Sequence, residues 1–443
     1  MKYFGTDGFR GKANDTLTLE HAVKIGKYLG RYFAKTTKVP RILIGKDTRK
    51  SSYMLEYGVA AGITSAGADA YLMHVTTTPS VSYAVKLDSF DCGVMITASH
   101  NPYYDNGIKI INSNGDKMGD EFLEGIEDYI DGKITIAEAK EPGDCIDYLS
   151  GRNKYISYLS TIPKNPFRGY KIGLDCANGA AFAIARNVFS ILGADIFILG
   201  NHPDGKNINV DCGSTHPGNL QKFVVENKLD AGFAFDGDAD RCIMVDEKGN
   251  IIDGDGIMYI IALYLKEHGE LSKDTVVATV MSNLGFTQAL HNHGIKVAST
   301  DVGDKYVAQE MFDNGYCVGG EQSGHIILSQ YANTGDGILT AIKLTDILVE
   351  TKNIASALVS GLNILPQKMK NIKVQDKKKV MDNADIVEGI KSINERISGK
   401  GRILLRASGT EPLIRIMTEA PSDEECDALI AEAEEIMKKF SEG

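Results

Sequence analysis

The alternation of apolar and polar segments along the chain follows one unit that recurs three times. Each copy runs from an apolar strand through a polar loop into a helical pattern, a glycine and a second strand, at residues 41–73, 170–199 and 275–299. In the first two copies the helix is followed by Gly-Ala-Asp, at 67–69 and 193–195, where the glycine can take the left-handed conformation that ends a helix. Strand, helix and strand in succession are typical of α/β structure, so the repetition predicts three α/β domains.

The chain after residue 364 follows a different pattern. It has a helical stretch, a strand at 403–407, a loop, a strand at 414–420 and an acidic amphipathic helix at 422–440. This order predicts a smaller fourth domain of the α+β type. With the glycine and proline clusters near residues 142 and 254, the pattern gives four expected domains: 1–150, 151–254, 255–366 and 367–443.

Composition and charge narrow the class of protein. The chain has 43% apolar and 24% charged residues, as soluble globular proteins do, and its net charge of −11 argues against a nucleic-acid or anionic membrane partner. The seven cysteines contain no C-x-x-C pair, which predicts reduced thiols rather than a disulfide framework or a zinc site. The first residues lack the apolar stretch of a signal peptide, so we expect a cytoplasmic location.

A serine followed by a histidine stands in the motif Thr-Ala-Ser-His-Asn-Pro at 97–102. Ser99 and His100 come directly after the apolar run 93–96, so they are expected in a loop at a strand end. A hydroxyl beside an imidazole is a candidate nucleophile, although an isolated Ser-His pair is more often an ordinary polar turn. The G-x-S-x-G motif is absent, which disfavours an α/β-hydrolase.

Three aspartates alternate between two apolar runs: Asp236, Asp238 and Asp240. If this segment is extended, alternate side chains point the same way and the carboxylates converge on one hard divalent cation. A calcium EF-hand would use Glu247 as well, but its required glycine is replaced by Arg241, and the flanks 231–235 and 242–245 are predicted as strands. A solvated acidic turn is the remaining alternative.

Two further loops carry candidate binding residues. In Gly-Gly-Glu-Gln-Ser-Gly-His at 319–325, Glu321 and Ser323 have groups that hydrogen-bond to sugar hydroxyls. In Arg-Ala-Ser-Gly-Thr-Glu-Pro at 406–412, followed by Arg415, guanidinium groups, hydroxyls and a glycine suit a phosphate. A hairpin turn with surface arginines fits the second segment as well.

In this order, one per predicted domain, the four motifs resemble the α-D-phosphohexomutase family over essentially the whole chain. The loop at 319–325 and the opening Tyr-Phe-Gly-Thr-Asp-Gly-Phe-Arg-Gly are most similar to the phosphoglucosamine mutase branch. The resemblance implies three similar α/β domains with mixed sheets and a smaller C-terminal domain around an active site in a central cleft. It implies Mg²⁺-dependent interconversion of glucosamine 6-phosphate and glucosamine 1-phosphate, through a phosphoserine and a sugar 1,6-bisphosphate. Catalytic glucosamine or glucose 1,6-bisphosphate is the implied activator.

The resemblance also assigns roles to residues. Ser99 is the implied phosphoserine, and it holds Mg²⁺ together with Asp236, Asp238 and Asp240. The residues implied around the reacting phosphate are Arg10, His100, Lys109 and Arg241, with Lys109 or His100 as the general acid or base. Those implied at the sugar are Asp301, Gly303, Asp304, Glu321, Ser323 and His325. Those implied at the non-reacting phosphate are Arg406, Ser408, Gly409, Thr410 and Arg415. The four domains then become the phosphoserine, metal-binding, sugar-binding and phosphate-binding lid domains.

The sequence departs from the family pattern at several positions, two of which bear on the site. Asp301 stands where a lysine is usual, so the charge contact that a lysine would make is not expected. Ala239 stands where glycine is common, which requires a metal loop without a positive φ at that position.

Other functions stay open at this stage. A phosphomannomutase or phosphoglucomutase is the alternative within the fold, and a catalytically inactive sugar-phosphate sensor or a metal-dependent phosphatase lies outside it. The expected partner is a small-molecule hexose phosphate, without nucleic acid or membrane, and a homodimer is left open.

Overall fold

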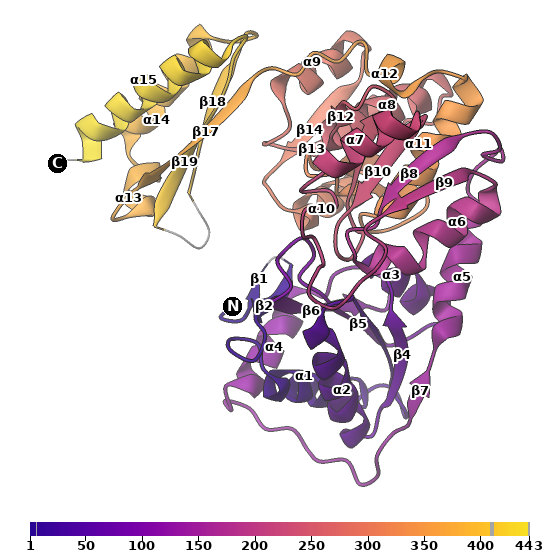
Figure 1. Ribbon diagram of the computed structural model, residues 1–443. Helices are drawn as coiled ribbons and strands as arrows, with labels where there is room; N and C mark the ends of the chain where they lie inside the picture. The colour runs from indigo at the N-terminus through magenta and orange to yellow at the C-terminus, as the bar shows by residue number, and fades with distance from the viewer. Residues whose placement is uncertain (6, 408–411, 442–443) are drawn as a thin grey trace. The chain divides into compact units, whose positions relative to one another are not determined.

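The structure is a computed structural model, and it describes residues 1–5, 7–407 and 412–441, with side chains as far as residue 438 (Figure 1). The chain divides into two compact units. One contains Met1–Met281 and Ile295–Ser360, and the other contains Ser282–Gly294 and the chain from Gly361 onward. No helix in the described part of the chain is long and apolar enough to cross a lipid bilayer.

The first sheet has seven strands in the order β1-β2-β6-β5-β3-β4-β7. Their bounds are β1 Phe4–Gly5, β2 Gly8–Lys12, β3 Arg41–Lys46, β4 Asp69–Val75, β5 Cys92–Ile96, β6 Asp105–Asn112 and β7 Cys145–Asp147. Strands β5, β3, β4 and β7 run parallel and the others pair antiparallel, so the sheet is mixed. In β3, Ile42 and Ile44 pack into one apolar cluster while Leu43 packs into another, because alternate side chains of a strand face opposite sides.

Helices α1 (Leu19–Phe33), α2 (Lys50–Ser65), α3 (Thr78–Leu87) and α4 (Asp120–Ile130) accompany this sheet. Helices α1 and α2 pack with their backbones in contact at Gly26 and Gly62. A Cβ atom at Gly26 would lie 2.2 Å from the Val59 carbonyl oxygen, and one at Gly62 would lie 2.2 Å from that of Val23. Only glycine permits this approach, so the pair of helices is fixed close together.

The second sheet has five strands in the order β12-β11-β10-β8-β9. Its strands are β8 Lys171–Asp175, β9 Asp195–Leu199, β10 Ala231–Phe235, β11 Cys242–Asp246 and β12 Ile251–Ile252. Its helices are α5 Leu149–Ser160, the 3₁₀ helix η1 Ala180–Ala183, α6 Ala185–Leu192 and α7 Gly218–Asn227. Gly193 ends α6 with a φ of 87°, as its place in the repeat predicts. Strands β10 and β11 form an antiparallel hairpin whose connecting loop contains the aspartate motif.

The third sheet has four strands in the order β14-β13-β15-β16. Its strands are β13 Thr275–Thr279, β14 Lys296–Thr300, β15 Val318–Gly320 and β16 Ile326–Leu328. Within the first unit the associated helices are α8 Gly254–Glu267, η2 Ser272–Asp274, α10 Asp304–Asn314, α11 Gly337–Thr351 and α12 Ala355–Leu358. Strand β13 is parallel to β14 and β15, and β15 is antiparallel to β16, so this sheet is mixed as well.

The second unit contains an antiparallel sheet of three strands in the order β17-β19-β18. Its elements are α9 Leu284–Asn292, β17 Gln367–Lys373, α13 Lys377–Met381, α14 Ala384–Arg396, β18 Arg402–Ala407, β19 Leu413–Glu419 and α15 Asp423–Ser441. Ile414 and Ile416 of β19 are fully buried and pack in one apolar cluster with Ile390 of α14 and Ile430 of α15. The helices therefore cover one face of this small sheet.

The predicted fold class is confirmed: three α/β domains with mixed sheets and a smaller C-terminal domain. The acidic helix predicted at 422–440 is α15. The prediction of a helical stretch directly after residue 364 is wrong, because β17 comes first. That strand is an edge strand whose side chains are mostly half-buried or exposed, so it lacks the apolar alternation that marks a strand.

Candidate active site

Ser99 lies in the loop that follows β5. The residue is 1% exposed, and its backbone φ is 51°. A left-handed backbone costs a residue other than glycine about 1–3 kcal/mol and persists only where the surroundings fix it. The side chain of Ser99 is held as well, because its Oγ donates a hydrogen bond of 2.5 Å to Asp236 Oδ2.

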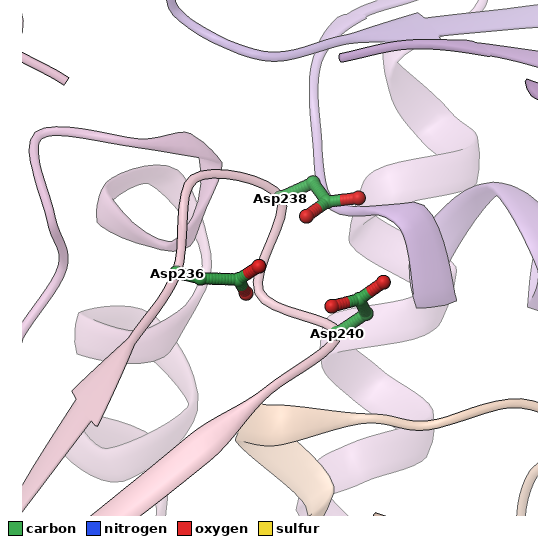
Figure 2. Close-up of side chains that lie close together, drawn as sticks. All are labelled: Asp236, Asp238 and Asp240. Atoms are coloured by element: carbon green, nitrogen blue, oxygen red, sulfur yellow. The ribbon is translucent and has the colours of Figure 1, made fainter. Parts of the chain in front are cut away.

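The three aspartates occupy the turn between β10 and β11, and Figure 2 shows their carboxylates pointing toward one another. All three residues are buried: Asp236, Asp238 and Asp240. Each offers an oxygen within 4.8 Å of the others, and the described residues hold no second group of this kind. The structure thus brings the carboxylates together, although through a turn rather than through the extended segment that we expected.

Ala239 corrects one prediction. Its φ is 56°, whereas the sequence led us to expect no positive φ at this position. The turn reverses the chain between two paired strands, and the left-handed residue completes that reversal. The Ala239 N–H donates to the Asp236 carbonyl at 3.1 Å, and the Gly337 N–H donates to the Ala239 carbonyl at 3.0 Å. These bonds offset the cost of about 1–2 kcal/mol that a side chain incurs in this conformation.

The donor set fits a divalent cation. Asp238 Oδ1 and Asp240 Oδ1 are buried and accept no hydrogen bond from any described residue. Burial, together with the charges of Asp240 and Asp238, raises the pKa of Asp236 well above its usual value. Such crowded carboxylates are stabilised when a hard cation binds them, and Mg²⁺ and Ca²⁺ prefer oxygen ligands of this type.

Lys109 of β6 lies against the aspartate turn. Its ammonium is 3.0 Å from Asp238 Oδ2 and 3.3 Å from Asp240 Oδ2, and the side chain is 6% exposed. Burial opposes the charged form of this lysine, but the surrounding carboxylates outweigh burial and raise its pKa. For Asp240, burial is likewise outweighed by Lys109 and His325, which lower its pKa.

Two residues that the sequence did not single out, Asp7 and Lys117, continue the ion pairs around Lys109. Asp7 Oδ1 lies 3.2 Å from the ammonium of Lys109 and 3.0 Å from that of Lys117. Lys117 in turn lies 2.6 Å from Asp304 Oδ2 at the start of α10. The side chains Asp238, Lys109, Asp7, Lys117 and Asp304 thus alternate in charge, and we call them the charge array. The only sequence signal for Asp7 was its place in the opening motif beside Arg10, with which it forms an ion pair.

The two histidines of the predicted site have opposite environments. His100 Nδ1 is 3.3 Å from Ser99 Oγ, and burial with the charges of Arg241 and Arg10 lowers the pKa of His100 to about 4. Burial opposes the charged form of His325, but Asp240 and Asp304 raise its pKa to about 9.

Three groups lie near the ring nitrogens of His325. Its Nδ1 is 3.8 Å from Asp240 and its Nε2 is 3.6 Å from Asp304. The two carboxylates favour a cationic ring, whereas the Gly335 N–H, 3.1 Å from Nε2, donates to that nitrogen and favours a neutral one.

The loops predicted to bind the sugar contact each other. The Gly303 N–H donates to Glu321 Oε1 at 3.2 Å, which joins the loop before α10 to the loop between β15 and β16. Glu321 is half-buried, whereas Asp301 and Ser323 are exposed. Arg241 directly follows the aspartate turn, and its backbone N–H donates to Asp236 Oδ1 at 3.2 Å.

The arginines predicted to bind the second phosphate lie in the second unit. Arg406 of β18 is the direct cross-strand partner of Arg415 of β19. Like charges that face each other across a sheet repel, and an anion bound between them removes the repulsion. Ser408, Gly409 and Thr410 lie outside the described residues.

Comparison with known proteins adds an independent observation. Four domain descriptions of phosphoglucomutase/phosphomannomutase match the chain: α/β/α domain I at 1–136, domain II at 148–249, domain III at 253–363 and the C-terminal domain at 369–436. A phosphoglucosamine mutase of Lachnoclostridium phytofermentans is 53% identical over 96% of this chain and 95% of that protein. Another, of Lachnospira eligens, is 51% identical over 99% and 98%. A phosphoglucomutase/phosphomannomutase family protein of Burkholderia thailandensis has the same fold, with a TM-score of 0.83, 24% identity, and 100% and 98% of the two chains covered.

Proposed function

This chain belongs to the phosphoglucomutase/phosphomannomutase family, and from that premise we propose that it interconverts glucosamine 6-phosphate and glucosamine 1-phosphate. The name that its curated relatives share supports the choice of substrate. One observation carries the chemistry: a buried serine hydroxyl lies 2.5 Å from a carboxylate of a three-aspartate cluster.

Mg²⁺ is the metal that we propose for this cluster. Asp236, Asp238 and Asp240 would hold it, because their oxygens converge and two of them have no hydrogen-bond donor among the described residues. When bound, the ion supplies positive charge to neutralise the oxygens of a transferring phosphoryl group. Phosphorylated Ser99 would add an oxygen ligand.

Ser99 carries the phosphoryl group in the proposed reaction. The bond between phosphorus and Ser99 Oγ breaks as a hydroxyl oxygen of the hexose monophosphate bonds to phosphorus. The hydroxyl proton passes to a base, and Ser99 Oγ, which leaves with the bonding electron pair, takes up a proton. The resulting 1,6-bisphosphate reorients, and its other phosphoryl group bonds to Ser99 Oγ, which loses its proton, while the departing sugar oxygen gains one and the isomeric monophosphate is released. A trace of glucosamine or glucose 1,6-bisphosphate primes the serine.

The proton acceptor is one of two residues. His100 is the better base in the structure, because its depressed pKa keeps it neutral and its Nδ1 is 3.3 Å from Ser99 Oγ. Lys109 is cationic beside Asp238, so it suits the neutralisation of phosphate charge, as Arg10 and Arg241 do, and would act as a base only if a bound metal ion displaced its proton.

The remaining residues divide by part of the substrate. The proposed sugar site consists of Asp301, Gly303, Asp304, Glu321, Ser323 and His325. The proposed site for the non-reacting phosphate consists of Arg406, Ser408, Gly409, Thr410 and Arg415. The domain roles follow: 1–150 carries the phosphoserine, 151–254 the metal, 255–366 the sugar and 367–443 a lid over the second phosphate. The central cleft, the cytoplasmic location and a possible homodimer remain predictions.

The test is kcat/KM for glucosamine, glucose and mannose phosphates side by side, with Mg²⁺ and a trace of hexose bisphosphate. One small group commonly supplies about 10- to 200-fold discrimination, so a preference for glucosamine phosphate above that range supports the assignment. Equal or better turnover of glucose or mannose phosphate moves the chain to the phosphoglucomutase or phosphomannomutase function. Binding without turnover indicates a sugar-phosphate sensor, and stoichiometric release of inorganic phosphate indicates a phosphatase.

A further inference from the structure

Arg49 lies in the loop between β3 and α2 and has no exposed surface. Its guanidinium group donates to main-chain carbonyls of the loop that contains Ser99. Nη2 donates to Ser99 O at 2.8 Å and to Asn101 O at 2.9 Å. Nη1 donates to Asp105 O at 3.2 Å and also to Pro102 O. The remaining donor, Nε, binds Asp47 Oδ2 at 2.7 Å.

All five N–H donors of the guanidinium group are therefore used, three of them on the loop after β5 and one on Asp105, where β6 begins. Carbonyl oxygens that converge on one point repel one another unless a cation lies between them. Lysine has three donors on a single atom and cannot span the same set. One arginine side chain thus binds four main-chain carbonyls of the segment 99–105.

The N–H group of Ser99 is tied to the same arginine through Asp47. Ser99 N donates to Thr97 Oγ1 at 2.9 Å, and that hydroxyl donates to Asp47 Oδ2 at 2.8 Å. Asp47 Oδ2 also accepts the bond from Arg49 Nε. The ion pair of Arg49 and Asp47 therefore holds both the N–H and the carbonyl of Ser99, whose φ angle is 51°.

The second domain contacts the loop at the same carbonyls. Asn209 Nδ2 donates to Ser99 O at 2.9 Å and to Asn101 O at 3.1 Å. Thr48, next to Arg49, donates to the Asn178 carbonyl at 2.6 Å. The Arg49 loop therefore supports the serine at the point where the aspartate turn of the second domain receives its hydroxyl.

We propose that Arg49 is a positioning residue for the phosphoryl carrier: it holds the Ser99 backbone in its left-handed conformation, and so aims Oγ at the aspartate turn. This inference rests on the proposed role of Ser99 as the phosphoserine. The Arg49 side chain donates to main-chain carbonyls and to Asp47, and to neither the Ser99 hydroxyl nor the sugar loops among the described residues, so its loss is expected to slow phosphoryl transfer without weakening sugar binding.

The experiment compares Arg49→Lys, Thr97→Val and a matched control, Arg41→Lys. Arg41 lies at the opposite end of β3 and donates to a single carbonyl, that of Asp88, at 3.1 Å. The first readout is the single-turnover rate at which glucose 1,6-bisphosphate phosphorylates Ser99, followed by intact mass. The second is the separate kcat and KM of the mutase reaction, on variants whose cooperative thermal unfolding shows that they are folded.

For Arg49→Lys we expect transfer to Ser99 to slow by at least about 100-fold with KM changed by less than about threefold, since a misplacement of about 1 Å costs about 10²-fold. For Thr97→Val we expect at least about tenfold, and for Arg41→Lys less than about threefold. Transfer at the wild-type rate in folded Arg49→Lys overturns the inference. If that variant does not fold, wild-type transfer in Thr97→Val overturns it.

Failure of the proposed function gives a different result. If the wild type takes up phosphate on Ser99 but does not isomerise glucosamine phosphate, the substrate assignment is wrong, and the phosphorylation rates still decide the role of Arg49. If the wild type never takes up phosphate on Ser99, the phosphoserine role and this inference are both overturned.

Discussion

Replacing Asp336 by asparagine is expected to stabilise the protein at neutral pH. Asp336 precedes α11 and is 2% exposed. Its Oδ1 accepts a hydrogen bond from the Leu339 N–H at 2.9 Å, and its Oδ2 accepts one from the Tyr155 hydroxyl at 2.6 Å. An asparagine carries no charge: its carbonyl accepts from Leu339 as before, and its amide donates to the Tyr155 oxygen, which reverses the direction of that bond.

The magnitude follows from the pKa. Burial is the largest cause that raises the pKa of Asp336 from 3.8 to about 6, although its hydrogen bonds lower it. At about 1.36 kcal/mol per pKa unit, the charged form costs about 3 kcal/mol in the folded state. Because the folded pKa is raised, the native state binds the proton more tightly. The stability that Asp336 contributes is thus fully present below pH 3.8 and is lost as the pH rises to about 6.

The assay is the urea denaturation midpoint of wild type and Asp336→Asn between pH 4.5 and 8, in EDTA so that no metal ion alters the neighbouring Asp240. We expect the free-energy advantage of the variant to grow with pH and to reach as much as about 3 kcal/mol above pH 7. Asp336→Ala, which loses both hydrogen bonds, is the comparison variant and should be less stable than Asp336→Asn at every pH. An advantage that is constant or that shrinks as the pH rises would refute the reasoning.

Three further predictions concern the site. Ser99→Ala should lower kcat/KM by at least about 10³-fold and abolish uptake of phosphate from hexose bisphosphate, as measured by a coupled assay and intact mass; near-normal turnover would exclude the phosphoserine. His100, whose pKa is lowered to about 4, should show no ring titration by NMR between pH 5.5 and 8, and a midpoint in that range would contradict its burial among cations. Lys109→Met leaves Asp238 and Asp240 without their ammonium partner, so its unfolding temperature should fall in EDTA and recover in part with Mg²⁺; an equal fall with and without Mg²⁺ would argue against a metal site there.

Much of the fold was predictable because each repeat consists of short local patterns. The apolar runs predict the strands, and the glycines that follow the helices, such as Gly193, predict where the helices end. Strand β17 was not predictable, since Gln367–Lys373 is an edge strand with few apolar residues, and it is a strand because β19 pairs with it. Here the tertiary partner decides the structure, and no local window contains it.

The site was predictable to the extent that motifs mark it. The three aspartates stand within five positions of one another, so their convergence could be inferred, but the positive φ of Ala239 depends on the hairpin around it. Asp7 and Lys117 were missed because single charged residues carry no periodic signal. Asp7 directly precedes β2 and Lys117 follows β6, and the two residues come together because the sheet pairs these strands.

The charge array described above also constrains how such a protein can evolve. Lys109 faces three carboxylates within 3.3 Å, and Lys117 faces two within 3.0 Å, so neutralising either lysine removes a counter-charge from at least two carboxylates at once. A lineage that replaced Lys117 would be expected to replace Asp7 or Asp304 in the same step or soon after. Positions 7, 117 and 304, far apart in the sequence, should therefore change together or stay fixed together.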